Sequence, residues 1–111
     1  MDKQRQHSDL VVSELAGDAD MVELVELFVS ELPMRMAAMC EAMDRDDLQT
    51  LTRLAHQLKG SAGGYGFPAI THAAMGLEET AKATSDVEQL AKQVSELAEL
   101  CAKARATPTV V

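Results

Sequence analysis

The chain has no tryptophan and few aromatic residues of any kind, which account for 3% of its 111 positions. Apolar residues nevertheless make up 47% of the sequence, and most of them are alanine, leucine, methionine and valine. A core of such small and flexible side chains is typical of closely packed helices. At this length the chain can bury one core and not a second one beside it, so we expect a single domain.

Metal-binding and nucleophilic patterns are also missing. The two cysteines, Cys40 and Cys101, show no C-x-x-C spacing and have no further ligands beside them. Both fall within amphipathic patterns, so we expect reduced thiols in the core of a cytoplasmic protein. The three histidines complete no recognisable zinc-binding spacing, and no serine or cysteine triad is evident. We therefore expect no metal site, and we interpret His7 and His72 as structural or incidental.

No stretch of the sequence is apolar over the length needed to cross a bilayer, and the polar first residues lead into no signal-peptide core. Acidic residues outnumber basic ones by 18 to 10, which gives a net charge of -8. Binding to a nucleic-acid backbone requires a concentrated basic surface. These features predict a cytoplasmic protein with neither membranes nor nucleic acids as partners.

Strand-like alternation of useful length does not occur, and apolar residues recur instead at helical spacing. The sequence predicts an all-α fold, an up-down antiparallel four-helix bundle with a short additional N-terminal helix. That extra helix would begin at Ser8 or Asp9 and end before Gly17. The predicted boundaries are a flexible segment over residues 1–8, the helical bundle over 9–105 and a frayed tail over 106–111.

The first long helix is predicted to begin after Asp18 or Asp20 and to end in the charged run at 44–47. Pro33 falls in the middle of this helix. Because proline lacks an amide donor and crowds the preceding turn, we expect a kink there rather than two separate helices. The methionines that follow at helical spacing are expected in the core rather than in a binding groove; they are Met36, Met39 and Met43.

The second long helix would start from a cap at Asp46 or Asp47 and continue to the glycines at 63, 64 and 66, where the chain reverses. The next helix would open at Pro68, because proline is tolerated in a first helical turn, and end near Ala83 or Thr84. For the last helix, Ser85 and Glu88 match the S-x-x-E capping box. Its predicted inward stripe comprises Val87, Leu90, Val94, Leu97 and Cys101.

His56 is the most informative residue of the second long helix. It lies roughly 140° from the centre of the apolar stripe, so its imidazole is expected to face water or a partner. Gly60 follows four residues later, where glycine costs about 1 kcal/mol relative to alanine. Bare backbone at this point would let another protein approach the ring, although tight helix packing is an alternative reason for the glycine. The same outward face carries Gln49, Thr52, Arg53 and Gly63.

Acidic residues are missing from the window Leu48–Leu77 in a chain that contains 18 of them. Arg53 and Lys59 would thus form a cationic surface that favours a dianion beside the histidine. Counted along the helices, His56 lies roughly 12 Å before the glycine turn and Glu78 roughly 15 Å after it. Glu78 can therefore reach the ring, accept a hydrogen bond from Nδ1 and leave Nε2 as the nucleophile. Lys59 could then neutralise the oxygens of an arriving phosphoryl group.

Each of these residues alone would be ordinary on a solvated helix, but together they match a known pattern. The string His56-Gln57-Leu58-Lys59-Gly60-Ser61-Ala62, followed by Gly66 and by Leu77-Glu78 on the next helix, resembles the H-x-x-K-G-[SA]-x-x-x-x-G pattern of histidine-containing phosphotransfer (HPt) domains of two-component phosphorelays. The likeness extends over roughly residues 9 to 105.

The resemblance implies a role for each residue of the pattern. His56 would be the phosphoacceptor, Lys59 the cation that supports the phosphate, Gly60 the gap that admits the partner and Glu78 the residue that orients the imidazole. The family carries Gln or Glu at this last position. The candidate partner-docking residues around the histidine are Gln49, Thr52, Arg53, Gln57 and Gly63.

By the same resemblance the chain would be a phosphoryl carrier without autokinase activity, which shuttles a phosphoryl group reversibly between aspartates of receiver domains. The receiver would supply Mg²⁺, and this chain would bind no cofactor. Response-regulator receiver domains are the expected partners, with a hybrid histidine kinase as a further candidate, and we expect a monomer. Two alternatives stay open: an excised domain of a hybrid or chemotaxis-type histidine kinase, and a helical adaptor that binds a receiver without accepting phosphate.

Overall fold

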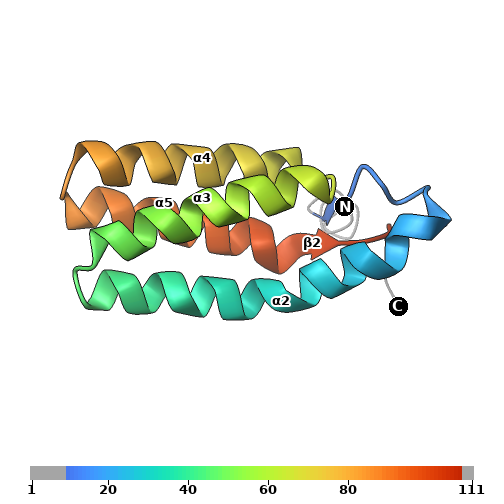
Figure 1. Ribbon diagram of the computed structural model, residues 1–111, viewed down its shortest axis with the longest axis horizontal. Coiled ribbons are helices and arrows are strands. Elements are labelled where there is room, and N and C mark those ends of the chain that lie inside the picture. The colour runs from blue at the N-terminus through green and yellow to red at the C-terminus, as the bar shows by residue number, and fades with distance from the viewer. Residues whose placement is uncertain (1–9, 109–111) are drawn as a thin grey trace, which may run out of the picture.

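The computed structural model describes residues 10–108. Its elements are β1 (Val11–Val12), α2 (Ala19–Asp44), α3 (Leu48–Gly64), α4 (Pro68–Ala83), α5 (Val87–Lys103) and β2 (Ala104–Arg105). The helices lie side by side, and each runs opposite to the one before it (Figure 1). The predicted all-α class and the four long helices are confirmed. The predicted flexible segment at 1–8, His7 and the end of the predicted tail at 109–111 lie outside the described residues.

The short additional N-terminal helix is not found in the described part of its segment, so that prediction is not confirmed. Residues 11–12 form a strand that pairs in parallel with β2, and a turn follows before α2. The backbone there bonds to residues far away in the sequence. The amide of Ser13 donates to the carbonyl of Arg105 at 3.0 Å, and that of Glu14 to the carbonyl of Gly66 at 2.8 Å. These partners replace the local bonds that a helix would have made.

Gly66 is the residue that allows this contact between the N-terminal segment and the α3–α4 turn. Its φ of 83° lies in the left-handed region, which glycine adopts without steric cost. A β-carbon at this position would also meet the Ser13 hydroxyl at 2.7 Å and the Glu14 amide at 3.0 Å. Both the turn and the close approach therefore require glycine.

The helix starts follow short-range capping rules, with one correction. Asp47 caps α3 by accepting a hydrogen bond from the amide of Thr50, and Pro68 occupies the first turn of α4, both as predicted. The cap of α5 is Asp86 and not Ser85, because the Asp86 carboxylate accepts from two backbone amides, at 3.1 and 3.3 Å. An acceptor that satisfies two unpaired amides is the stronger start signal.

Pro33 lies inside α2, which continues as one helix from Ala19 to Asp44. The continuity agrees with the prediction of a single helix. Figure 1 shows the axis of α2 bending along its length, as expected for a helix that contains an internal proline.

The core is formed where each helix turns one stripe toward the others. The buried apolar residues include Val25, Phe28, Leu32, Met36, Met39, Leu51, Ala55, Leu58, Ala62, Phe67, Ile70, Ala74, Leu77, Leu90, Val94, Leu97 and Cys101. Met43 differs from the prediction, because it lies at the edge of this core and is only partly buried. Phe28 stacks on Tyr65 and on Phe67, with ring centroids 4.9 and 5.8 Å apart, and so ties α2 to the α3–α4 turn.

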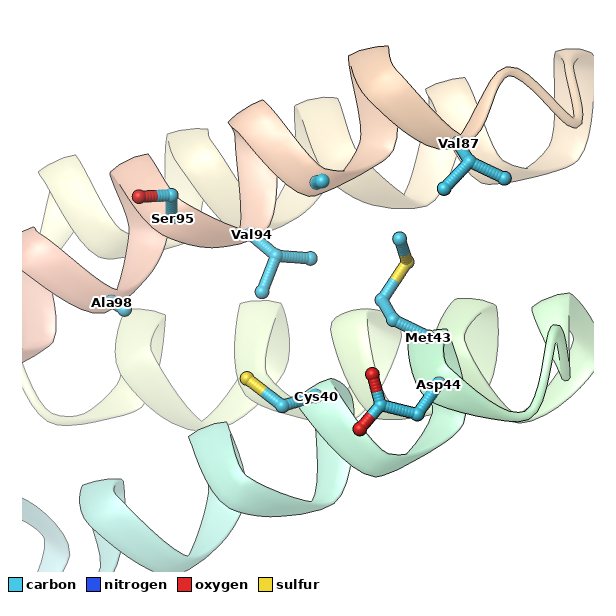
Figure 2. A pocket seen from close by; sticks show the side chains of 8 residues that line it. Cys40, Met43, Asp44, Val87, Val94, Ser95 and Ala98 are labelled. Carbon is cyan, nitrogen blue, oxygen red and sulfur yellow. The ribbon is translucent and has the colours of Figure 1, made fainter.

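Two further core predictions are wrong, and both fall on the same groove. Cys40 is exposed, and Val87 is 52% exposed, because α2 and α5 leave an open space of about 460 Å³ between them here. Figure 2 shows Met43 and Val94 pointing into this space from opposite helices, with Cys40 beside them. We call it the α2–α5 groove; its lining comprises Cys40, Met43, Asp44, Val87, Ala91, Val94, Ser95 and Ala98.

Candidate functional site

The α3–α4 hairpin brings His56 and Glu78 together. Nδ1 of His56 lies 2.8 Å from Oε2 of Glu78, so the predicted contact across the hairpin is present. The imidazole is 63% exposed, whereas the carboxylate is 7% exposed. The carboxylate thus lies behind the ring, on the protein side, and the ring faces outward.

This contact decides which ring nitrogen is available. The pKa of Glu78 is lowered from 4.5 to about 2, mainly by the hydrogen bond from Lys59, with further hydrogen bonds from His56 and Lys82 acting against the desolvation that raises it. Glu78 is therefore ionised near neutral pH and can only accept hydrogen bonds. Nδ1 must then carry a proton, and Nε2 on the opposite edge of a neutral ring keeps its lone pair.

Lys59 and Lys82 both bind the same carboxylate. Nζ of Lys59 lies 2.9 Å from Oε1 of Glu78, and Nζ of Lys82 lies 3.3 Å from Oε2. Lys59 was expected beside an arriving phosphoryl group, but here it is bound to Glu78. Lys82 was missed by sequence reasoning, although its position one turn after Glu78 places it on the same helix face and could have indicated the pair.

Gly60 lies open on the outward side of α3. A β-carbon there would have no neighbouring atom within 4 Å, so helix packing does not account for this glycine. Gly64 is equally open, and a β-carbon at Gly63 would meet only the Thr71 hydroxyl, at 3.6 Å. The backbone on the C-terminal side of His56 is therefore accessible, as predicted.

The other predicted docking residues lie on α3 as well. Gln49, Arg53, Gln57 and Gly63 are exposed. Thr52 is half-buried, and its hydroxyl donates to the carbonyl of Leu48 at 2.8 Å, which satisfies its donor within the helix.

The window Leu48–Leu77 contains no acidic residue, but the surface around His56 in the folded protein does include carboxylates. Glu78 reaches into the site from α4. At the other end of α3, the Thr50 hydrogen bonds, together with Arg53 and Arg45, hold the pKa of Asp47 below its ordinary value. The cationic surface predicted from Arg53 and Lys59 is therefore partly neutralised by these two carboxylates.

Other parts of the described chain offer no comparable arrangement. His72 is exposed and lines a small cleft with Glu14 and Thr71 instead of joining His56. The α2–α5 groove receives no residue from α3 or α4, and Asp44 is its only charged lining residue.

Within residues 10–108, no group of three or more His, Cys, Asp or Glu is placed to hold a metal ion. No helix of this region has both the length and the apolar character of a membrane span.

Comparison with known proteins gives a consistent result. The family model described as the Hpt domain matches residues 23–107. The phosphorelay protein LuxU of Vibrio vulnificus, from strains YJ016 and CMCP6, is 34% identical to the chain over 71 residues in each case. The match covers 64% of this chain and 62% of LuxU, so less than two thirds of the relatives' length is spanned. No solved structure gives a significant match.

Proposed function

Since this chain belongs to the Hpt-domain family, we propose that it relays a phosphoryl group between receiver-domain aspartates through phospho-His56. The observation that carries the proposal is the exposed imidazole whose Nδ1 is held by a buried, ionised carboxylate. This arrangement leaves one nucleophilic nitrogen, Nε2, facing a partner. The similarity to a phosphorelay protein supports the same assignment.

The transfer step follows from the hydrogen bond at Nδ1. The lone pair on Nε2 attacks the phosphorus of an aspartyl phosphate, a new N–P bond forms, and the P–O bond to the aspartate breaks. The aspartate leaves as a carboxylate with the bonding electron pair. The ring, which keeps its Nδ1 proton, becomes positively charged, and that charge arises 2.8 Å from the Glu78 carboxylate. Glu78 thereby orients the nucleophile and stabilises the charge that develops on it.

The reverse reaction uses the same geometry. A phosphoramidate and an acyl phosphate are both high-energy, so the direction of net flow follows the concentrations of the partners. The chain acts as a carrier, without kinase activity of its own. In this proposal the receiver supplies Mg²⁺ and this chain binds no metal or other cofactor.

The partner would dock on the outward face of α3. Gly60 and Gly63 offer backbone without projecting side chains, which lets the receiver's phosphorylated aspartate approach Nε2. Gln49, Thr52, Arg53 and Gln57 border this approach. We propose that the chain works as a cytoplasmic monomer, with a response-regulator receiver or a hybrid histidine kinase as its partner.

The test is transfer of label from a panel of phosphorylated, Mg²⁺-loaded receiver domains to the wild type, to His56→Gln and to the matched control His72→Gln. Wild type and His72→Gln should acquire acid-labile, base-stable phosphate, and His56→Gln should acquire none. Circular dichroism should show equal helicity for all three. Receiver binding without labelling of the wild type would contradict the proposal and favour a helical adaptor.

A further inference from the structure

Lys82 is a charged residue of the site to which the phosphotransfer pattern gives no role. It lies one turn after Glu78 on α4, and its Nζ is 3.3 Å from Glu78 Oε2. The same oxygen accepts the Nδ1 hydrogen bond of His56 at 2.8 Å. Lys59 occupies the other oxygen, Oε1, at 2.9 Å. One carboxylate therefore holds two ammonium groups and the imidazole.

The two lysines differ in exposure and in what they can reach. The Lys59 side chain lies on α3 with His56 and is 29% exposed, whereas the Lys82 side chain is 63% exposed on α4. A phosphoryl group on Nε2 brings a dianion to the outward edge of the ring, and Lys59 is the cation that the family pattern assigns to it. To bind the phosphoryl oxygens, Lys59 must weaken or leave its contact with Oε1.

The departure of Lys59 would have a cost at Glu78. This carboxylate is 7% exposed, so water can replace little of the lost interaction with Lys59, and a buried charge that loses one of its partners is destabilised. The carboxylate would also repel the phosphoryl dianion across the imidazole. A second cation that stays on Glu78 offsets both effects.

We propose that Lys82 is a positioning residue that keeps Glu78 neutralised while Lys59 turns to the phosphoryl group on His56. Lys82 forms no bond to phosphorus and transfers no proton. It acts through Glu78, and in this way it favours the phosphorylated form of the carrier. The inference rests on the proposed phosphotransfer function.

The experiment measures the equilibrium distribution of label between this chain and a receiver domain that labels the wild type, charged with acetyl phosphate and Mg²⁺. The variants are Lys82→Gln, Lys82→Arg, Glu78→Gln and the double variant Lys82→Gln/Glu78→Gln. Lys103→Gln is the matched control, because Lys103 is exposed in the last turn of α5, at the end of the bundle away from the end of α4 (Figure 1). Thermal unfolding of each variant checks that it is folded.

Lys82→Gln should lower the equilibrium constant for formation of phospho-His56 by about fivefold, in the range of a single exposed ion pair. Lys82→Arg should preserve it, because arginine can reach the same oxygen, and Lys103→Gln should match the wild type. In the Glu78→Gln background, Lys82→Gln should have no further effect, since the charge that Lys82 neutralises has been removed.

Two results would overturn the inference. A Lys82→Gln variant equal to the wild type would show that Lys59 and His56 suffice for Glu78. An equal loss in the wild-type and Glu78→Gln backgrounds would show that Lys82 acts on the phosphoryl group directly. Neither result affects phosphorylation of the wild type at His56, whereas a wild type that no receiver labels contradicts the proposed function itself and this inference with it.

Discussion

Along the contact of α3 with α4, a carboxylate with 7% exposure holds an imidazole and two ammonium groups. The contact of α2 with α5 instead leaves an apolar groove of about 460 Å³ whose one charged lining residue is Asp44. Both regions border the same core. A buried ionised group persists only where several donors satisfy it. The α3–α4 contact therefore needs particular donor residues around Glu78. The groove has no such requirement, and it is where two of the predicted core positions, Cys40 and Val87, are exposed.

The largest change in the free energy of unfolding should come from truncating a core residue next to each of these two regions. Leu58 is fully buried beneath the His56 face, whereas Val94 is 6% exposed at the groove. Leu58→Ala should lower the free energy of unfolding by about 3 kcal/mol and Val94→Ala by about 1.5 kcal/mol, because valine loses fewer carbon atoms than leucine and the wall of an open groove loses fewer contacts. Urea denaturation measures both. Equal losses would mean that the groove is packed as tightly as the α3–α4 contact.

A substitution at Gly60 should change the stability of the fold and the rate of phosphoryl transfer in opposite directions. Because a β-carbon there meets no atom within 4 Å, Gly60→Ala should raise the free energy of unfolding by about 1 kcal/mol. The same methyl group would intrude on the proposed docking face, so the rate of phosphoryl transfer from a receiver should fall severalfold. Urea denaturation and a transfer time course report the two effects. A stabilised variant with an unchanged transfer rate would remove Gly60 from the docking face.

The ion pairs at Glu78 should make the free energy of unfolding depend on pH in the acid range. The pKa of the Glu78 carboxyl group is about 2 in the folded protein, whereas its ordinary value is 4.5. A lowered carboxyl pKa stabilises the fold above the ordinary value, and this contribution is lost as the pH falls from about 4.5 to about 2. Wild type should therefore be more stable than Glu78→Gln at pH 7, and the difference should shrink across that window. A difference that is the same at pH 7 and pH 3 would contradict the ion pairs at Glu78.

The smallest effect is expected in the groove. Cys40 is exposed and forms no disulfide, so Cys40→Ser should change the free energy of unfolding by less than about 0.5 kcal/mol. Labelling of His56 should be unchanged, since no groove residue belongs to α3 or α4. A marked loss of stability, measured by thermal unfolding, would show that the thiol is packed into the core after all.

Much of the fold could be predicted because its signals are local. Helical spacing, the Asp47 cap and the proline at the start of α4 each act within a few residues. The contact of His56 with Glu78 was also predictable, because residues at similar distances from a hairpin turn meet across it. The β1–β2 pairing was not, since it joins Val11 to Ala104 and Val12 to Arg105, at opposite ends of the chain. Contacts between such distant residues leave no periodic signal in the sequence.

The charge arrangement of the site was only partly predictable. The sequence placed Lys59 and Glu78 near His56, but it did not indicate Lys82 and could not show that Lys59 binds Glu78 in the unphosphorylated protein. That partner depends on how the side chains of two packed helices compete for one carboxylate. Cys40 and Val87 were misplaced for a related reason, because an amphipathic stripe defines the face of a helix but not how closely the neighbouring helix approaches it.

In the proposed mechanism, Glu78 holds Nδ1 of His56 and leaves Nε2 as the nitrogen that accepts the phosphoryl group. The most direct test is NMR of the phosphorylated protein labelled with ¹⁵N in its histidines, in which coupling to ³¹P identifies the bonded nitrogen. We predict phosphorus coupling at Nε2 of His56, with a proton on Nδ1. Phosphorylation at Nδ1, or on another residue, would show that Glu78 does not direct phosphoryl transfer to Nε2 of His56.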